Sequence, residues 1–84
     1  MFYVYILKSS KDQNLYIGST NNIVKRLKEH NNGLVLSTRN RRPFKLVYFE
    51  GYVAEVDARH REKNLKLRAR ALKQLLNRIK QSTS

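Results

Sequence analysis

The sequence predicts an α+β fold, a small three-stranded antiparallel sheet flanked by helices in the order β-β-α-β-α-α. Three short runs rich in aromatic and β-branched residues, at 2–7, 15–18 and 46–50, have the composition and length of strands. Apolar residues at helical spacing lie between the second and third runs and again after residue 53. With 84 residues and no linker-like stretch, we expect one domain over residues 1–80 and a frayed tail at 81–84.

The first two strands are expected to form a hairpin. Residues Phe2 to Leu7 are apolar on both alternating faces, which predicts a strand buried on both sides. The polar segment from Ser9 to Asn14 has the composition of a turn, and the apolar pattern resumes at Leu15 to Gly18.

A helix follows a tight turn at Gly18 and Ser19. Thr20 or Asn21 can cap its start, and the run Asn31-Asn32-Gly33 predicts its end, because glycine readily adopts the left-handed conformation. At about 100° per residue, an apolar side forms from Ile23, Val24 and Leu27, while Lys25, Lys28 and Glu29 point to water.

Arg26 and His30 lie one turn apart along the border of that apolar side. Taken singly, each has a structural explanation: Arg26 as a side chain whose stem packs while its charge reaches water, His30 as a cation at the helix C-terminus. Together, and directly after Tyr16 and Gly18 at a strand end, they indicate a functional site.

The segment from Leu34 to Lys45 is polar and basic. We interpret it as a loop whose cations bind phosphate groups or, equally, form a solvated charged surface. The candidate phosphate contacts are Arg39, Arg41, Arg42 and Lys45. Leu46 to Glu50 is the third expected strand.

The remainder of the chain is expected to be helical. One helix covers about Val53 to Leu67, and a third helix, or its continuation, covers about Ala69 to Ile79. The residues expected to face the core in the latter are Ala69, Leu72, Leu76 and Ile79.

Glu62 lies on the edge of an apolar helix face that includes Ala54, Ala58 and Leu65. A carboxylate turned toward a core needs a partner, because its burial otherwise costs free energy. That partner is either a neighbouring basic side chain or a hard cation such as Mg²⁺.

Composition restricts the function. Eighteen Lys and Arg against six Asp and Glu give a net charge of +12, which predicts binding to a polyanion, with nucleic acid as the first choice. No helix pairs a broad bulky apolar face with a basic one, which disfavours a membrane partner. The chain has no cysteine, which excludes a cysteine nucleophile or thiolate metal site, and no apolar run near the length of a membrane span. We expect a soluble cytoplasmic protein.

The candidate site residues come from four expected elements. They are Tyr5, Tyr16, Gly18, Arg26, His30 and Glu62. This set matches no serine-type triad and no zinc ligand spacing. It suits phosphodiester cleavage, in which a metal polarises the phosphate, an arginine stabilises developing charge, and a tyrosine or histidine takes a proton from water.

With these residues in place, the chain resembles a GIY-YIG nuclease domain of the small stand-alone bacterial type. The halves of the signature correspond to YVY at residues 3–5 and YIG at residues 16–18. Tyrosine and valine stand where the name-giving glycine and isoleucine would be, at positions that we interpret as structural. The family's helix arginine, its histidine and its metal-binding glutamate fall on Arg26, His30 and Glu62. The segment STRNRRPFKLVYFE is also similar, so the resemblance covers nearly the whole chain.

The resemblance implies Mg²⁺-dependent hydrolysis of DNA, with Mn²⁺ as a substitute metal. Glu62 would hold the metal, Arg26 would stabilise the phosphorane-like charge, and Tyr5 would activate the water with Tyr16 assisting and His30 accepting a proton behind it. Because an unperturbed tyrosine has a pKa near 10, Arg26, the metal or the basic surroundings would have to lower that pKa. The asparagine that many members carry after the glutamate has two candidates here, Asn64 and Asn77.

Three readings of function stay open. The first is a nuclease used in DNA repair or processing, which acts on a DNA structure rather than a sequence, receives its target from a partner protein, or is weakly active. The second is a nucleic-acid-binding module that keeps the fold with little or no activity, for DNA or RNA. The third, docking on an acidic protein, rests on charge alone and leaves the site residues unexplained.

Overall fold

A computed structural model describes the backbone of residues 1–83 and the side chains of residues 1–70. The elements in chain order are β1 (Phe2–Ser9), β2 (Leu15–Thr20), α1 (Ile23–Asn31), the 3₁₀ helix η1 (Arg39–Arg41), β3 (Phe44–Tyr52) and α2 (Glu55–Thr83). The strands form one antiparallel sheet in the order β2-β1-β3. The predicted α+β fold with a three-stranded antiparallel sheet is therefore confirmed.

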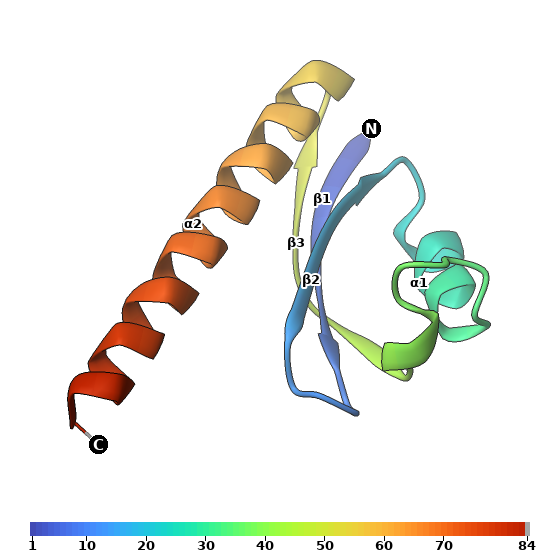
Figure 1. Ribbon diagram of the computed structural model, residues 1–84. Helices are drawn as coiled ribbons and strands as arrows, with labels where there is room; N and C mark the ends of the chain where they lie inside the picture. Colours follow the sequence, from blue (N-terminus) through green and yellow to red (C-terminus); the bar gives the residue numbers. More distant parts are fainter. Residues whose placement is uncertain (84) are drawn as a thin grey trace.

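The sheet lies between two helical layers, with α2 on one face and α1 on the other (Figure 1). Because side chains alternate along a strand, central strand β1 supplies both cores. Val4 packs with Ile17 and Ala58 on the α2 face, whereas Tyr5 and Leu7 pack with Phe44 on the α1 face. This arrangement confirms that β1 is buried on both sides.

The ends of α1 differ in part from expectation. The N-cap is Asn22, whose side chain accepts a hydrogen bond from the Lys25 amide, so Thr20 and Asn21 were the wrong choices. The predicted end is confirmed, with Asn32 as C-cap and Gly33 at a φ of +76°. Val24 was expected on the packed side but is 66% exposed.

Asn31, expected only as part of that helix end, also joins α1 to β3. Its amide donates to the Phe44 carbonyl at 3.0 Å, and its Oδ1 accepts from the Phe44 N–H at 2.7 Å. This pair of hydrogen bonds fixes the last turn of α1 against the start of β3.

Of the two alternatives for residues 69–79, a third helix or a continuation of the second, the structure has the continuation, so the observed order is β-β-α-β-α rather than β-β-α-β-α-α. Helix α2 runs to Thr83 and so continues into the tail that was expected to fray. It extends past the sheet (Figure 1), which explains why Ala69, expected in the core, is exposed. The side chains of Leu72, Leu76, Asn77 and Ile79 lie outside the described residues. Among the described residues, no helix is long and apolar enough to cross a membrane.

An ion pair ties the first half of α2 to β3. Arg61 donates from Nε and Nη2 to the Glu50 carboxylate at 3.0–3.1 Å, and the Tyr52 hydroxyl donates to the same group at 2.5 Å. The Arg61 guanidinium, followed by the Tyr52 hydroxyl, lowers the pKa of Glu50 to about 2.

Candidate active site

The centre of the site is the point where β1 and β2 pair Tyr5 with Gly18. A Cβ atom at residue 18 would lie 2.5 Å from Tyr5 Oη and 3.2 Å from Tyr16 Cε1. A methyl group at that position would therefore displace the Tyr5 hydroxyl. The tight turn expected at Gly18 and Ser19 was wrong, because both residues lie within β2, which continues to Thr20. Gly18 is required for the close approach of Tyr5 rather than for an unusual backbone conformation.

A chain of polar side chains runs from the sheet into the loop after α1. The Tyr5 hydroxyl lies 3.0 Å from His30 Nε2, and His30 Nδ1 lies 2.8 Å from Thr38 Oγ1. Tyr5 is 2% exposed, and the other two side chains are fully buried. The structure therefore joins two predicted site residues through a direct hydrogen bond.

The hydrogen-bond partners of His30 favour one tautomer of its ring. Thr38 donates its one hydroxyl proton to the Val35 carbonyl at 3.4 Å, so its oxygen accepts from His30 Nδ1. Nε2 is then the unprotonated nitrogen and accepts from the Tyr5 hydroxyl. Burial, followed by the nearby Arg26 charge, lowers the pKa of His30 and favours this neutral form.

The pKa of Tyr5 differs from expectation. Burial raises it from 10.0 to about 12, and the Arg26 guanidinium beside the hydroxyl only partly opposes this rise. Arg26 and the basic surroundings therefore do not lower the pKa of Tyr5 below its usual value, contrary to expectation. The physical reason is desolvation, because a phenolate with almost no access to water loses more hydration than one arginine replaces.

Arg26 and Tyr16 complete this side of the site. Arg26 is half-buried, and its guanidinium lies 3.8 Å from the Glu29 carboxylate. The Tyr16 ring packs edge-on to His30, with ring centroids 4.9 Å apart, and its centroid lies 6.3 Å from that of Tyr5. The structure thus brings together the four residues predicted to be catalytic: Tyr5, Tyr16, Arg26 and His30.

Glu62 lies on the α2 side of the sheet. Its Oε2 accepts from the Ser19 hydroxyl at 2.7 Å, and its Oε1 pairs with Lys66 Nζ at 2.7 Å. Burial favours the neutral acid, but Lys66 and then Ser19 outweigh it and lower the pKa of Glu62. The carboxylate is therefore ionised at neutral pH and 19% exposed.

This carboxylate fits a Mg²⁺ ligand. Within the described part of the chain, no three His, Cys, Asp or Glu side chains gather into a metal-binding group. Mg²⁺ usually keeps several waters and binds through one or two carboxylates together with substrate phosphates. An ionised, accessible Glu62 is sufficient for that mode. Binding of the metal would replace the ion pair between Glu62 Oε1 and Lys66 Nζ.

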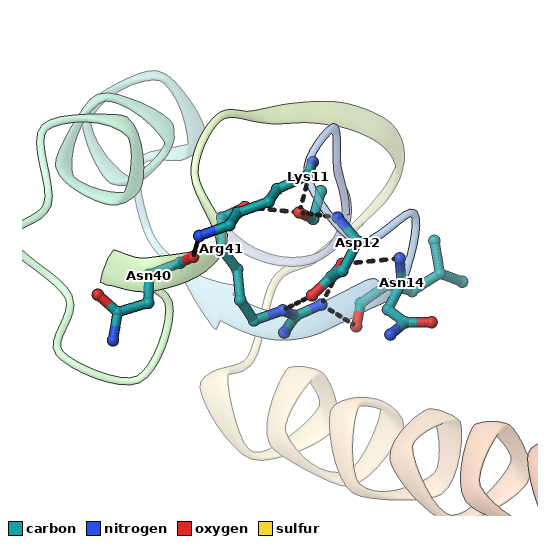
Figure 2. A network of polar contacts seen from close by, with 7 residues as sticks. Lys11, Asp12, Asn14, Asn40 and Arg41 are labelled. Carbon is teal, nitrogen blue, oxygen red and sulfur yellow. Dashed lines mark hydrogen bonds and ion pairs between the residues drawn. The ribbon is translucent and has the colours of Figure 1, made fainter.

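In the basic loop around η1, the side chain of Arg41 binds the β1–β2 hairpin (Figure 2). Arg41 Nε donates to Asp12 at 2.7 Å, and its Nη2 donates to the Leu15 carbonyl at 3.4 Å, which ties the loop to the β1–β2 hairpin. Lys11 donates to the Asn40 carbonyl at 2.9 Å beside it. Arg41 is thus occupied within the protein.

The other predicted phosphate contacts are exposed. Arg39 Nε donates to the Gly33 carbonyl at 3.0 Å and Arg42 Nε donates to the Arg39 carbonyl at 2.8 Å, while Lys45 lies on β3. Phosphate binding by Arg39, Arg42 and Lys45 stays a prediction.

Sequence reasoning missed two contacts. Thr38 lies in the segment expected to be a polar loop, although it is fully buried against His30. Ser19 was assigned only to the turn before α1, although it hydrogen bonds Glu62. No local pattern signals either contact, since the partners are eight and 43 positions away.

The fold and this set of side chains define a GIY-YIG catalytic domain, and the sequence profile of that domain matches residues 1–79. The chain therefore belongs to the GIY-YIG family, a nuclease family.

Within that family, the chain is similar to the UPF0213 proteins. It is 54% identical to the one of Clostridium perfringens over 67 residues, which is 79% of this chain and 71% of that protein. It is 46% identical to the one of Syntrophus aciditrophicus over 82 residues, covering 95% and 91% of the two chains. The solution NMR structure of a UPF0213 protein from Bacillus halodurans superposes with a TM-score of 0.52 at 35% identity, covering 95% of this chain and 86% of that one.

Proposed function

We propose that this chain is an endonuclease that hydrolyses phosphodiester bonds of DNA with Mg²⁺, or with Mn²⁺ in its place. The observation that carries the proposal is the direct contact from the Tyr5 hydroxyl to the unprotonated nitrogen of a buried, neutral His30. A fold that only bound nucleic acid would need a basic surface and no buried acid–base pair.

Proton transfer follows from the polarity of that contact. Tyr5 is protonated at neutral pH, because burial raises its pKa to about 12. It can take a proton from the attacking water only if its own proton moves to His30 Nε2 in the same step. Thr38 holds the imidazole in the tautomer that accepts this proton.

Charge stabilisation falls to Arg26 and Glu62. Arg26, beside the Tyr5 hydroxyl, is placed to stabilise the partial negative charge on the phenol oxygen during the proton transfer and the charge that develops on the phosphate. Glu62 would hold the metal, which when bound polarises the phosphate and stabilises the leaving oxygen. Tyr16 packs against His30 and orients it.

The choice of target depends on the structure of the DNA or on a partner protein. A net charge of +12 supports binding to any phosphate backbone, and it carries no sequence information. We therefore propose action on branched, nicked or single-stranded DNA in repair or processing, in the cytoplasm, with targeting supplied by DNA structure or by a partner protein.

The experiment that tests the function compares wild type, Glu62→Gln and the control Asp57→Asn on branched, nicked, single-stranded and duplex DNA. Asp57 is an exposed acid on the same helix. With Mg²⁺ or Mn²⁺, wild type and the control should give products that EDTA abolishes. Glu62→Gln should cut at least about 10²-fold more slowly, with DNA affinity largely retained. Equal cleavage by Glu62→Gln and wild type would show that Glu62 is not the metal ligand.

A nucleic-acid-binding module with little activity is the second candidate. The raised pKa of Tyr5 favours it, because at a pKa of about 12 almost none of the phenolate that could act as a base is present at neutral pH. Binding without products on every substrate, unchanged by Glu62→Gln, would select this function over the nuclease.

A further inference from the structure

Helix α2 carries a row of four cations beside Glu62. The row consists of Arg59, Lys63, Lys66 and Arg70, all exposed. At about 100° per residue these side chains fall within an arc of about 60°, on the side of Glu62 away from the sheet. At about 1.5 Å per residue the row is about 16 Å long.

The same cations border one open depression of the surface together with Ser19, Glu62 and Leu67. Two of them have acidic partners: Arg59 pairs with Glu55 at 2.6 Å, and Lys66 pairs with Glu62 at 2.7 Å. For Lys63 and Arg70, no carboxylate lies within ion-pair distance among the residues whose side chains are described. The depression therefore has an excess of positive charge around a single central carboxylate.

We propose that this row on α2 is the docking surface for the phosphodiester backbone of the nucleic-acid substrate, and that it leads the backbone across Glu62. The proposal rests on the proposed function and adds where the substrate lies. The length of the row equals about five steps of one DNA strand at about 3.4 Å each. Leu67 is the only apolar residue of the depression larger than alanine among its described lining, which disfavours a lipid surface.

The row differs in kind from the basic loop around η1. Each arginine of that loop donates its Nε–H to a backbone carbonyl or to Asp12. Lys63 and Arg70 keep their donors for a ligand, as far as the described side chains show. Their charge also lies beside the one carboxylate that would hold the metal, so a bound backbone would bring its phosphates to that ion.

The test measures binding in EDTA, so that it does not depend on cleavage. Fluorescence anisotropy with a labelled 20-nucleotide strand and its duplex, over a KCl series, would compare wild type, Lys63→Gln/Arg70→Gln and the control Lys25→Gln/Lys28→Gln. The control removes the same charge from the exposed side of α1. Losing two phosphate contacts should flatten the slope of log K against log[salt] by about 1.8 for duplex and about 1.4 for single strand.

Further variants separate charge from fold. Lys63→Arg/Arg70→Lys conserves the charge and should keep the wild-type slope, and poly-glutamate should compete only weakly. An equal flattening by the α1 control would overturn the proposal, because diffuse charge would then explain the binding. If the α2 pair leaves the slope unchanged while wild type still cleaves DNA with Mg²⁺, the docking surface is wrong and the proposed function stands.

Discussion

The two faces of the sheet handle polar groups in opposite ways. On the α1 face, Tyr5, His30 and Thr38 are almost fully buried, uncharged and hydrogen bonded to one another. On the α2 face, Glu62 and Lys66 are ionised, paired and open to water. One sheet thus separates a dry, neutral side from a wet, charged side.

The difference follows from desolvation. A buried group holds its neutral form, so it can pass a proton along a fixed hydrogen bond without carrying a charge at rest. An accessible carboxylate remains ionised and can attract a metal or approach a phosphate. The Glu62 charge still reaches the α1 face, where it adds to the rise in the pKa of Tyr5 that burial causes.

The largest effect is expected at Arg26, the charged group that borders the neutral side. Arg26→Ala should lower kcat by about 10³-fold, because it removes the cation that opposes the rise in the pKa of Tyr5 and that, in the proposed function, stabilises charge on the phosphate. Single-turnover cleavage measures this. Lys25→Ala, an exposed neighbour, is the matched control, and equal losses would reduce Arg26 to a general phosphate contact.

A smaller effect is expected when His30 loses the hydrogen bond to Thr38 that fixes its tautomer. Thr38→Val leaves His30 Nδ1 without its buried partner, which favours moving the proton to Nε2 and blocks acceptance from Tyr5. We expect kcat to fall by about 10²-fold with KM unchanged, and the pH–rate profile to shift. Thr38→Ser should restore both, whereas a purely structural role would change thermal stability without moving the profile.

The smallest effect on activity is expected at Glu50, which stabilises the charged side by binding Arg61. Glu50→Gln should leave cleavage unchanged and lower the free energy of unfolding at pH 7 by about 2 kcal/mol. Because folding lowers the pKa of Glu50 from 4.5 to about 2, its stabilisation is complete above pH 4.5 and is lost as the pH falls toward 2. Urea unfolding of both proteins should therefore converge near pH 2, and a constant difference would contradict the ion pair.

The neutral side has its own acid response in the same measurement. The folded protein lowers the pKa of His30 below 6.5, so the unfolded chain takes up the proton first. Wild type should therefore begin to lose stability as the pH falls below about 6.5, before Glu50 begins to titrate.

Much of this architecture could be predicted from local patterns. Alternation identified β1 as buried on both sides, and spacing placed Tyr5, Tyr16, Arg26 and His30 in one site. The capping residue was missed because several polar residues precede α1, and only backbone geometry selects Asn22. The Thr38 contact and the raised pKa of Tyr5 depend on tertiary burial, which the pattern of the loop and the strand does not contain.

The central position of β1 makes the site sensitive to register. Val4 and Tyr5 are neighbours in sequence but belong to different cores, and Tyr5 faces Gly18 only in the observed pairing. A shift by one residue would exchange the two faces and place the phenol against α2. The pairing of Tyr5 with Gly18, rather than the presence of either residue in the sequence, therefore decides whether the proposed proton transfer to His30 can occur.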